Sequence, residues 1–208
     1  MSDFFFSLPF FIHVLDLIGT IIFAFTGAFK AIENKYDLFG IIVLSSITGF
    51  FGGVMRDVLL GKIPPYAFVD PFYIIMTVLT GILTFYIYPL LKYKDLFIKL
   101  DAIGLGVFSI IGSGIAFNLF GLNYIIMALS GIITAIGGGI IRDILVNETP
   151  LIFVKELYVT SSFIGITIFF MLLYIGMDYN ISSLIGIGII ILFRFISMKY
   201  GWNLPRRK

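Results

Sequence analysis

Cysteine is absent from this chain of 208 residues, histidine occurs once, and charged side chains make up only 12% of the sequence. Without cysteine there is no disulfide, no thiolate metal site and no cysteine nucleophile. The single His13 argues against a histidine-rich metal centre, so neither a cofactor nor a tightly held metal ion is expected. No nucleophile–base set stands out, which disfavours an enzyme. The basic residues form no soluble patch, which disfavours nucleic acid as a partner.

Apolar residues account for 60% of the sequence and lie in long runs separated by short charged loops. A bilayer core of roughly 30 Å accepts helices of about 20 such residues. The first run carries Asp3 and continues as a full span, so we expect a helix and not a cleavable signal. The pattern predicts an all-α integral membrane protein with seven transmembrane helices in a single domain: Leu8–Phe29, Phe39–Leu60, Phe72–Leu91, Ala102–Leu122, Tyr124–Leu145, Leu157–Met177 and Ile181–Met198.

Basic residues are divided very unequally between the two membrane faces that seven helices define, once Arg56 and Arg142 are set aside as intramembrane candidates. Lys62 stands alone on one face. The other face holds Lys30, Lys35, Lys92, Lys94, Lys99, Lys155, Arg194, Lys199, Arg206, Arg207 and Lys208. Because basic loops stay in the cytoplasm, this asymmetry predicts a cell-membrane protein with its N-terminus outside and its C-terminus cytoplasmic.

The two halves of the chain repeat each other. Asp16–Gly19 matches Asp101–Gly104 at an offset of 85 residues, and Gly52–Asp57 matches Gly138–Asp143 at an offset of 86. Each repeat, about 8–91 and about 101–177, holds three helices, so the second copy must enter the membrane from the opposite face. The seventh helix, about 181–198, is additional. Inverted repeats are common in proteins that move solutes or ions along a path between the repeats, which makes transport the leading class.

Glycines gather in the second helix of each repeat. They are Gly49, Gly52 and Gly53 in the first, and Gly137, Gly138 and Gly139 in the second. Each glycine costs about 1 kcal/mol against alanine in a helix interior, and such clusters are sites of kinks. We expect both helices to be interrupted here and to line a polar path, because lipid cannot satisfy freed carbonyls. The alternative is close packing of two helices through small residues.

An arginine–aspartate pair follows each glycine run: Arg56-Asp57 and Arg142-Asp143. Ionised groups inside apolar helices are costly and usually face a bundle interior or a water-filled cavity. Neighbouring residues on a helix point about 100° apart, so we expect each arginine to find its main partner in the opposite repeat. The aspartates should lie close enough to offset the positive charge near the two ends of the path. A structural clamp at the membrane edge is the alternative.

Hydroxyl side chains precede both glycine runs. Thr48 and Thr134 could coordinate a partly dehydrated cation together with freed carbonyls, or could link helices by hydrogen bonds. Three serines lie about one turn further back: Ser45, Ser46 and Ser130. Asp16 and Asp101 begin matched helices, where a role as partner of the helix dipole is favoured.

The stretches Thr48–Pro65 and Thr134–Pro150, with their doubled Gly-Gly-x-x-Arg-Asp pattern, resemble the prokaryotic trimeric intracellular cation (TRIC) channels, and the isoleucine- and lysine-rich composition resembles archaeal members. The resemblance implies a homotrimer in a lipid membrane, with one pore per protomer lined by the kinked second and fifth helices. It further implies passage of potassium, sodium and other monovalent cations. The family's pattern has three glycines before x-x-Arg-Asp, and Phe51 stands where the first of them is usual, so the resemblance implies a shallower or shifted bend in the first repeat.

The same doubled pattern is similar to bacterial membrane proteins regarded as glycine transporters, which leaves a second function open. A channel needs one continuous wet path, whereas a transporter needs alternating gates around an occluded site. The sequence favours the channel, with a secondary transporter of a small amino acid such as glycine as the alternative.

Overall fold

The computed structural model describes residues 10–90, 95–154 and 157–202, and every regular element within these ranges is a helix. Six of these helices are long and apolar enough to cross a membrane, and α8 is a shorter apolar helix of 17 residues. The elements are α1 (Phe10–Glu33), α2 (Leu38–Leu59), α3 (Tyr66–Val69), α4 (Pro71–Ile87), the 3-10 helix η2 (Tyr88–Leu90), α5 (Leu96–Phe120), α6 (Tyr124–Leu145), α7 (Leu151–Val154), α8 (Tyr158–Tyr174) and α9 (Tyr179–Tyr200).

Each predicted span overlaps one of the seven longer helices, but most boundaries are displaced by a few residues. Helix α1 continues to Glu33 instead of ending at Phe29, and α5 begins at Leu96 instead of Ala102. Hydropathy placed the α5 boundary after Asp101, yet this residue is buried within the helix. Several predicted features lie outside the described residues: the span ends Leu8 and Leu91, and the basic residues Lys92, Lys94, Lys155, Arg206, Arg207 and Lys208.

The starts of α2 and α6 carry matching caps. Asp37 accepts a hydrogen bond from the backbone N–H of Gly40, and Asn123 accepts one from that of Ile126. These caps satisfy N–H groups that a helix leaves without an internal partner, and the two capping residues are 86 positions apart. The repeat seen in the glycine runs therefore extends to the first residues of these helices.

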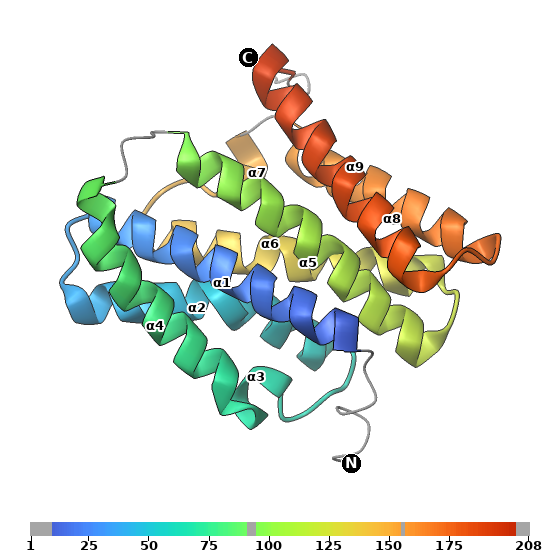
Figure 1. Ribbon diagram of the computed structural model, residues 1–208, viewed down its shortest axis with the longest axis horizontal. Coiled ribbons are helices and arrows are strands. Elements are labelled where there is room, and N and C mark those ends of the chain that lie inside the picture. Colours follow the sequence, from blue (N-terminus) through green and yellow to red (C-terminus); the bar gives the residue numbers. More distant parts are fainter. Residues whose placement is uncertain (1–9, 91–94, 155–156, 203–208) are drawn as a thin grey trace.

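Helix α5 lies at the centre of the bundle. Figure 1 shows α4, α1, α5 and α9 in succession, with α2 and α6 behind α1 and α5. The α5 glycines pack inside the chain: Gly104 against Phe23, Gly106 against Ile191, Gly112 against Thr134 and Gly114 against Tyr179. Their lack of side chains brings α1, α6 and α9 close to α5.

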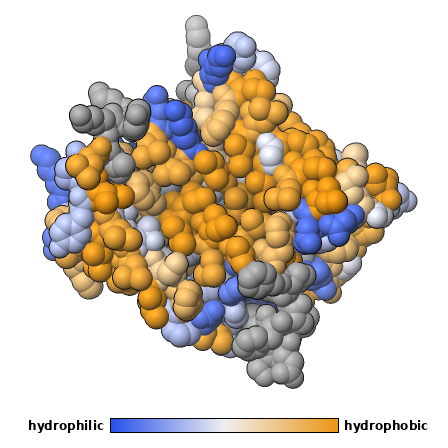
Figure 2. Space-filling view, in the orientation of Figure 1, coloured by the Kyte–Doolittle hydropathy of each residue, from blue (hydrophilic) through white to orange (hydrophobic). Residues whose placement is uncertain are grey.

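Apolar side chains cover most of the face shown in Figure 2, and hydrophilic ones gather toward its margins. Large exposed apolar residues are spread along the outer helices, for example Phe72 and Leu83 on α4 and Leu184 and Leu192 on α9. An apolar surface of this extent is suited to lipid and not to water. The chain is a multi-span membrane protein.

Candidate functional site

The two glycine runs meet where α2 packs against α6. A Cβ atom added to Gly52 would collide with the backbone carbonyl of Thr134, and one added to Gly138 would collide with that of Thr48. Both helices pass through their glycines without interruption. Neither helix is broken at its glycines in this structure, and a bend at these glycines stays a prediction. The glycines instead allow the two backbones to touch, as the close-packing alternative requires.

The other glycines of the runs make room for neighbouring groups. At the matched positions Gly53 and Gly139, an added Cβ would lie 3.5 Å from Nη2 of Arg56 and 3.7 Å from Nη2 of Arg142. Each guanidinium therefore folds back over the glycine three residues before it. The two remaining glycines pack against neighbours, Gly49 against Thr77 and Thr20, and Gly137 against Gly52 and Met55.

The hydroxyls predicted as ion ligands are buried and hydrogen-bonded to the protein. Thr48 donates to the carbonyl of Leu44 and Thr134 donates to that of Ser130, each at 2.6 Å within its own helix. Ser130 in turn donates to the carbonyl of Gly112 on α5 at 2.8 Å. In this structure Ser130 links two helices, while the threonines satisfy their hydroxyls locally.

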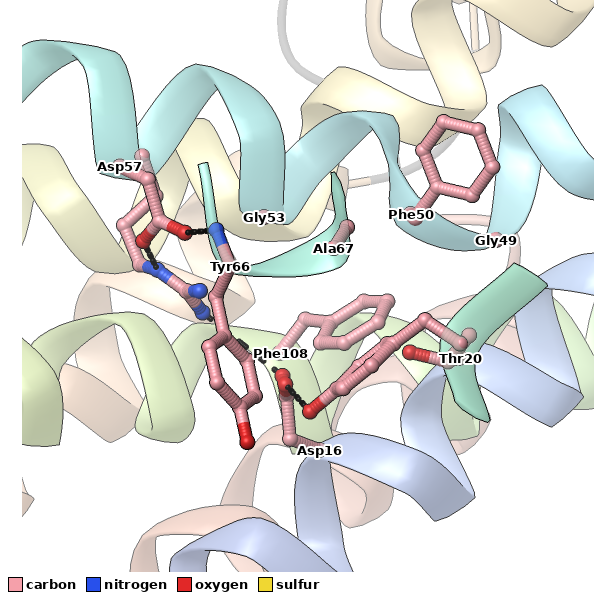
Figure 3. A pocket seen from close by; sticks show the side chains of 11 residues that line it. Asp16, Thr20, Gly49, Phe50, Gly53, Asp57, Tyr66, Ala67 and Phe108 are labelled. Carbon is pink, nitrogen blue, oxygen red and sulfur yellow. Dashed lines mark hydrogen bonds and ion pairs between the residues drawn. The ribbon is translucent and has the colours of Figure 1, made fainter. Parts of the chain in front are cut away.

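Four side chains form a buried polar group near the end of α2, which we name the first-repeat cluster: Asp16, Arg56, Asp57 and Tyr73. Asp16 and Asp57 are labelled in Figure 3. Arg56 Nε donates to Asp57 at 2.8 Å, and Arg56 Nη1 lies 3.6 Å from Asp16. Tyr73 donates its hydroxyl to the other oxygen of Asp16 at 2.5 Å. Asp57 also accepts the backbone N–H of Tyr66 at 2.9 Å, which ties the start of α3 to α2.

The matched residues near the end of α6 form the second-repeat cluster: Asp101, Arg142, Asp143 and Tyr158. Arg142 donates from Nε to Asp143 and from Nη1 to Asp101, both at 2.8 Å. Tyr158 donates to the other oxygen of Asp101 at 2.6 Å. Asp143 accepts the backbone N–H of Leu151, at the start of α7, at 3.0 Å. Every contact of the first-repeat cluster thus has a counterpart 85 or 86 residues later.

These contacts correct two expectations. Each arginine is paired with the aspartate that follows it and with an aspartate of its own repeat, not chiefly with the opposite repeat. The angular argument compares Cβ directions, but a long guanidinium can fold back over a glycine. Asp16 and Asp101 do not act at helix starts, because both lie inside their helices as ion-pair partners. The expectation that Asp57 and Asp143 lie close enough to offset the arginines agrees with the observed distances.

The two clusters are not equally tight. Arg142 makes further contacts, because its Nη1 donates to Thr26 of α1 at 3.0 Å and its guanidinium lies 4.7 Å from the centre of the Phe97 ring. In the first-repeat cluster the arginine reaches Asp16 only at 3.6 Å. Among the described residues, one nitrogen of each arginine makes no hydrogen bond, Nη1 of Arg56 and Nη2 of Arg142, but Nη1 of Arg142 donates to two side chains. The second-repeat cluster is therefore the more completely bonded of the two.

Two small cavities adjoin the first-repeat cluster, each with a volume of about 10 Å³, enough for one water molecule. The cavity in Figure 3 is bordered by Asp16 of α1, Asp57 of α2 and Tyr66 of α3. The other is also lined by His13 and Lys62. Burial lowers the pKa of the Lys62 ammonium, which the Asp57 carboxylate opposes, and burial raises the pKa of Tyr66 to about 12. A third small cavity borders Arg142 at the matched position.

Three residues of the site were not predicted from the sequence. Tyr73 and Tyr158 supply the hydroxyl to each cluster, and their spacing of 85 residues could have revealed them. Arg194 was counted as a basic residue of the cytoplasmic face, but it is 1% exposed and its guanidinium lies 4.7 Å from the centre of the Tyr158 ring. Within the described ranges, no group of three or more potential metal ligands comes together.

Comparison with known proteins gives one family model, described as glycine transporter, which matches this chain twice, over residues 13–89 and 98–174. The curated relative YadS of Escherichia coli strain K12, a UPF0126 inner membrane protein, is 38% identical over 156 residues. The match covers 74% of this chain and 75% of YadS.

Solved structures with the same fold are cation channels. One TRIC cation channel is 35% identical, with a TM-score of 0.85 over 97% of this chain and 98% of its own. The TRIC trimeric intracellular cation channel orthologue from Rhodobacter sphaeroides is 30% identical, with a TM-score of 0.88 over 91% of this chain and 98% of its own. These proteins are described as channels, not as enzymes.

Proposed function

This chain belongs to the family of TRIC cation channels and glycine-transporter-like bacterial membrane proteins, and from that premise we propose that it conducts monovalent cations, chiefly potassium, through one pore in each protomer. Likeness to solved cation channels over nearly the whole chain supports this function. The observation that carries it within the molecule is the packing of α2 against α6, where both glycine runs meet.

The glycine contact corresponds to a closed path. No ion can pass where the backbone at Gly52 touches that at Thr134 and the backbone at Gly138 touches that at Thr48, so conduction requires α2 and α6 to bend or separate there. Glycines weaken a helix by about 1 kcal/mol each and provide a soft point for this movement. Once the helices part, the hydroxyls and carbonyls of Thr48 and Thr134 become available to a partly dehydrated cation.

The two arginine clusters border this path beyond the glycines. Each arginine lies beside two aspartates, so its charge does not present an uncompensated barrier to cations. The clusters also tie α2 to α1 and α6 to α5, and their bonds must rearrange if these helices move. We therefore assign Arg56 and Arg142 to tuning and gating of the pore.

The arrangement we propose is two inverted three-helix repeats, about 8–91 and about 101–177, followed by the seventh helix in a single domain. The tandem family match at residues 13–89 and 98–174 supports the duplication. Lys30 at the end of α1 pairs with Glu148 after α6 at 2.8 Å, so these ends share one face, as the inverted order requires. The basic asymmetry supports an external N-terminus and a cytoplasmic C-terminus in the cell membrane.

A homotrimer in contact with membrane lipids completes the proposal. It is supported by solved relatives described as trimeric channels. Since the α5 glycines are occupied inside the protomer, contacts between protomers must come from other surfaces. A detergent-corrected mass of three chains would agree with this assembly, and a mass of one or two would contradict it.

One experiment separates the channel from the glycine transporter. Purified protein is reconstituted into planar bilayers with potassium chloride, and in parallel into liposomes offered labelled glycine. Single-channel current steps without saturable glycine uptake support the channel. Saturable uptake without current steps would replace it with the transporter, whose alternating gates the two arginine clusters could form equally well.

A further inference from the structure

Arg194 belongs to the helix that follows the two repeats, yet its side chain lies buried in the interior of the bundle. It lies on α9, the helix outside the two repeats, and is 1% exposed. Its guanidinium carbon is 4.7 Å from the centre of the Tyr158 ring on α8. A cation held over an aromatic face away from water is stabilised by the negative charge of the ring face. The contact therefore fastens α9 to Tyr158.

Tyr158 passes this contact on to the second-repeat cluster. Its ring meets Arg194, while its hydroxyl donates to Asp101 at 2.6 Å. Asp101 in turn accepts from Arg142 at 2.8 Å. An unbroken series of contacts thus runs from α9 through α8 and α5 to α6, the helix that carries the second glycine run.

The matched tyrosine of the first repeat has different neighbours. Tyr73 meets the rings of His13 and Tyr66 edge-on, with centroids 6.2 Å and 5.5 Å away. Its acceptor Asp16 stands 3.6 Å from Arg56, against 2.8 Å for the matched pair in the second repeat. The cluster whose tyrosine contacts an arginine of α9 is thus the one with the shorter ion pair.

We infer that Arg194 is a positioning residue for the second-repeat cluster, holding Tyr158 so that Asp101 and Arg142 stay paired and this end of the path stays closed. The inference rests on the proposed channel function. It makes the two ends of the path unequal, since α9 supports only one of them, and it gives the helix outside the repeats a role in gating.

The first test compares Arg194→Met with Arg194→Lys in single-channel recordings. Methionine keeps the apolar volume but removes the charge, so the open probability should rise by roughly tenfold while the unit conductance stays the same. Lysine restores a cation over the ring and should bring the open probability back toward that of the unaltered channel. An unchanged open probability in Arg194→Met, or equal effects of the two variants, would overturn the inference.

A double-mutant cycle separates positioning from general damage to the fold. In a Tyr158→Leu background, Arg194→Met should have no further effect on open probability, because the ring it acts through is gone. In the matched Tyr73→Leu background the effect of Arg194→Met should remain in full. If Arg194→Met changed the open probability equally in both backgrounds, the inference would be wrong.

A spectroscopic measurement can be made on variants that assemble too poorly for current recordings. Fluorotyrosine placed at position 158 should show a ¹⁹F shift that moves in Arg194→Met, moves less in Arg194→Lys, and is unaltered by Gly188→Ala, a change on α9 with nothing within 4 Å of the added Cβ. A ¹⁹F shift that is the same in Arg194→Met as in the unaltered protein would contradict the contact. If the unaltered protein gave no current steps, the channel proposal would fail. If the protein conducted but the Arg194 variants had the same open probability as the unaltered channel, this inference alone would be refuted.

Discussion

Gly138 of α6 lies so close to the carbonyl of Thr48 on α2 that no Cβ atom fits between them. The reciprocal contact, Gly52 against the carbonyl of Thr134, makes this a paired backbone crossing and not a chance approach of one residue. Such closeness maximises dispersion contacts in a lipid setting, where no hydrophobic effect drives helices together. The same closeness closes the proposed ion path, so stability and closure depend on the same atoms.

Gly138→Ala should therefore destabilise the closed protein by about 1–3 kcal/mol, because the added Cβ meets backbone that cannot rotate away. The thermal unfolding midpoint in a fixed detergent reports the loss. Gly188→Ala is the matched control, since nothing lies within 4 Å of a Cβ there. In protein that still assembles, Gly138→Leu should reduce unit conductance, because the longer side chain would occupy the path that opens when α2 and α6 separate. Equal midpoints for the two alanine variants would contradict the crossing.

Replacing the arginine of each cluster with alanine should lower the free energy of unfolding by unequal amounts. Arg142→Ala leaves Asp101 and Asp143 buried without their cation, a loss of about 3–5 kcal/mol. Arg56→Ala should cost less, because its ion pair with Asp16 is longer and adjoining cavities can admit water. Unfolding midpoints of the two variants, measured together, test the order. A larger loss for Arg56→Ala would show that the tighter cluster is not the stronger one.

The length of the apolar runs was sufficient to predict the longer helices, but polar residues inside α5 led to a wrong prediction of where that helix begins. The run Ala102–Leu122 was correctly predicted as helix, while the preceding turns of α5 were missed because Lys99 and Asp101 look like the start of a loop. Asp101 stays inside the helix because Arg142, 41 positions later, offsets its charge. Hydropathy reads each residue alone and cannot include a partner that only the fold supplies.

The site was predicted in its residues more than in its contacts. The repeated pattern identified Arg56, Asp57 and the glycines, but what a glycine run does depends on what faces it. A glycine run lowers helix stability by the same amount whether the helix bends or packs closely against another. The facing backbone of Thr134 or Thr48 determines that these helices pack closely. Arg194 was considered only for topology, because a basic residue near a helix end usually marks the cytoplasmic face, and its contact with Tyr158 was not foreseen.

The proposed orientation predicts which introduced cysteines can be labelled, and the native chain has none to interfere. Lys62→Cys and Asn180→Cys should react with a membrane-impermeant maleimide in intact cells. Glu148→Cys should react only after permeabilisation, because it shares a face with Lys30. Labelling of position 148 together with protection of position 62 would reverse the orientation.

Thr48→Val tests whether this hydroxyl serves the ion or the fold. Thr48 donates only to Leu44 of its own helix, so replacing it with a side chain of similar shape should change stability by less than about 1 kcal/mol. If the hydroxyl meets the passing cation once α2 and α6 part, unit conductance should fall roughly threefold to tenfold.

Ser45→Ala is the control for this prediction, because the Ser45 hydroxyl lies 3.0 Å from the carbonyls of both Ala24 and Thr77 and so links α2 to α1 and α4. It should lower the thermal midpoint and leave unit conductance unchanged, the reverse of Thr48→Val. A loss of stability without a loss of conductance in Thr48→Val would place this hydroxyl with Ser45 among the links between helices, and the narrow part of the path would have to lie elsewhere.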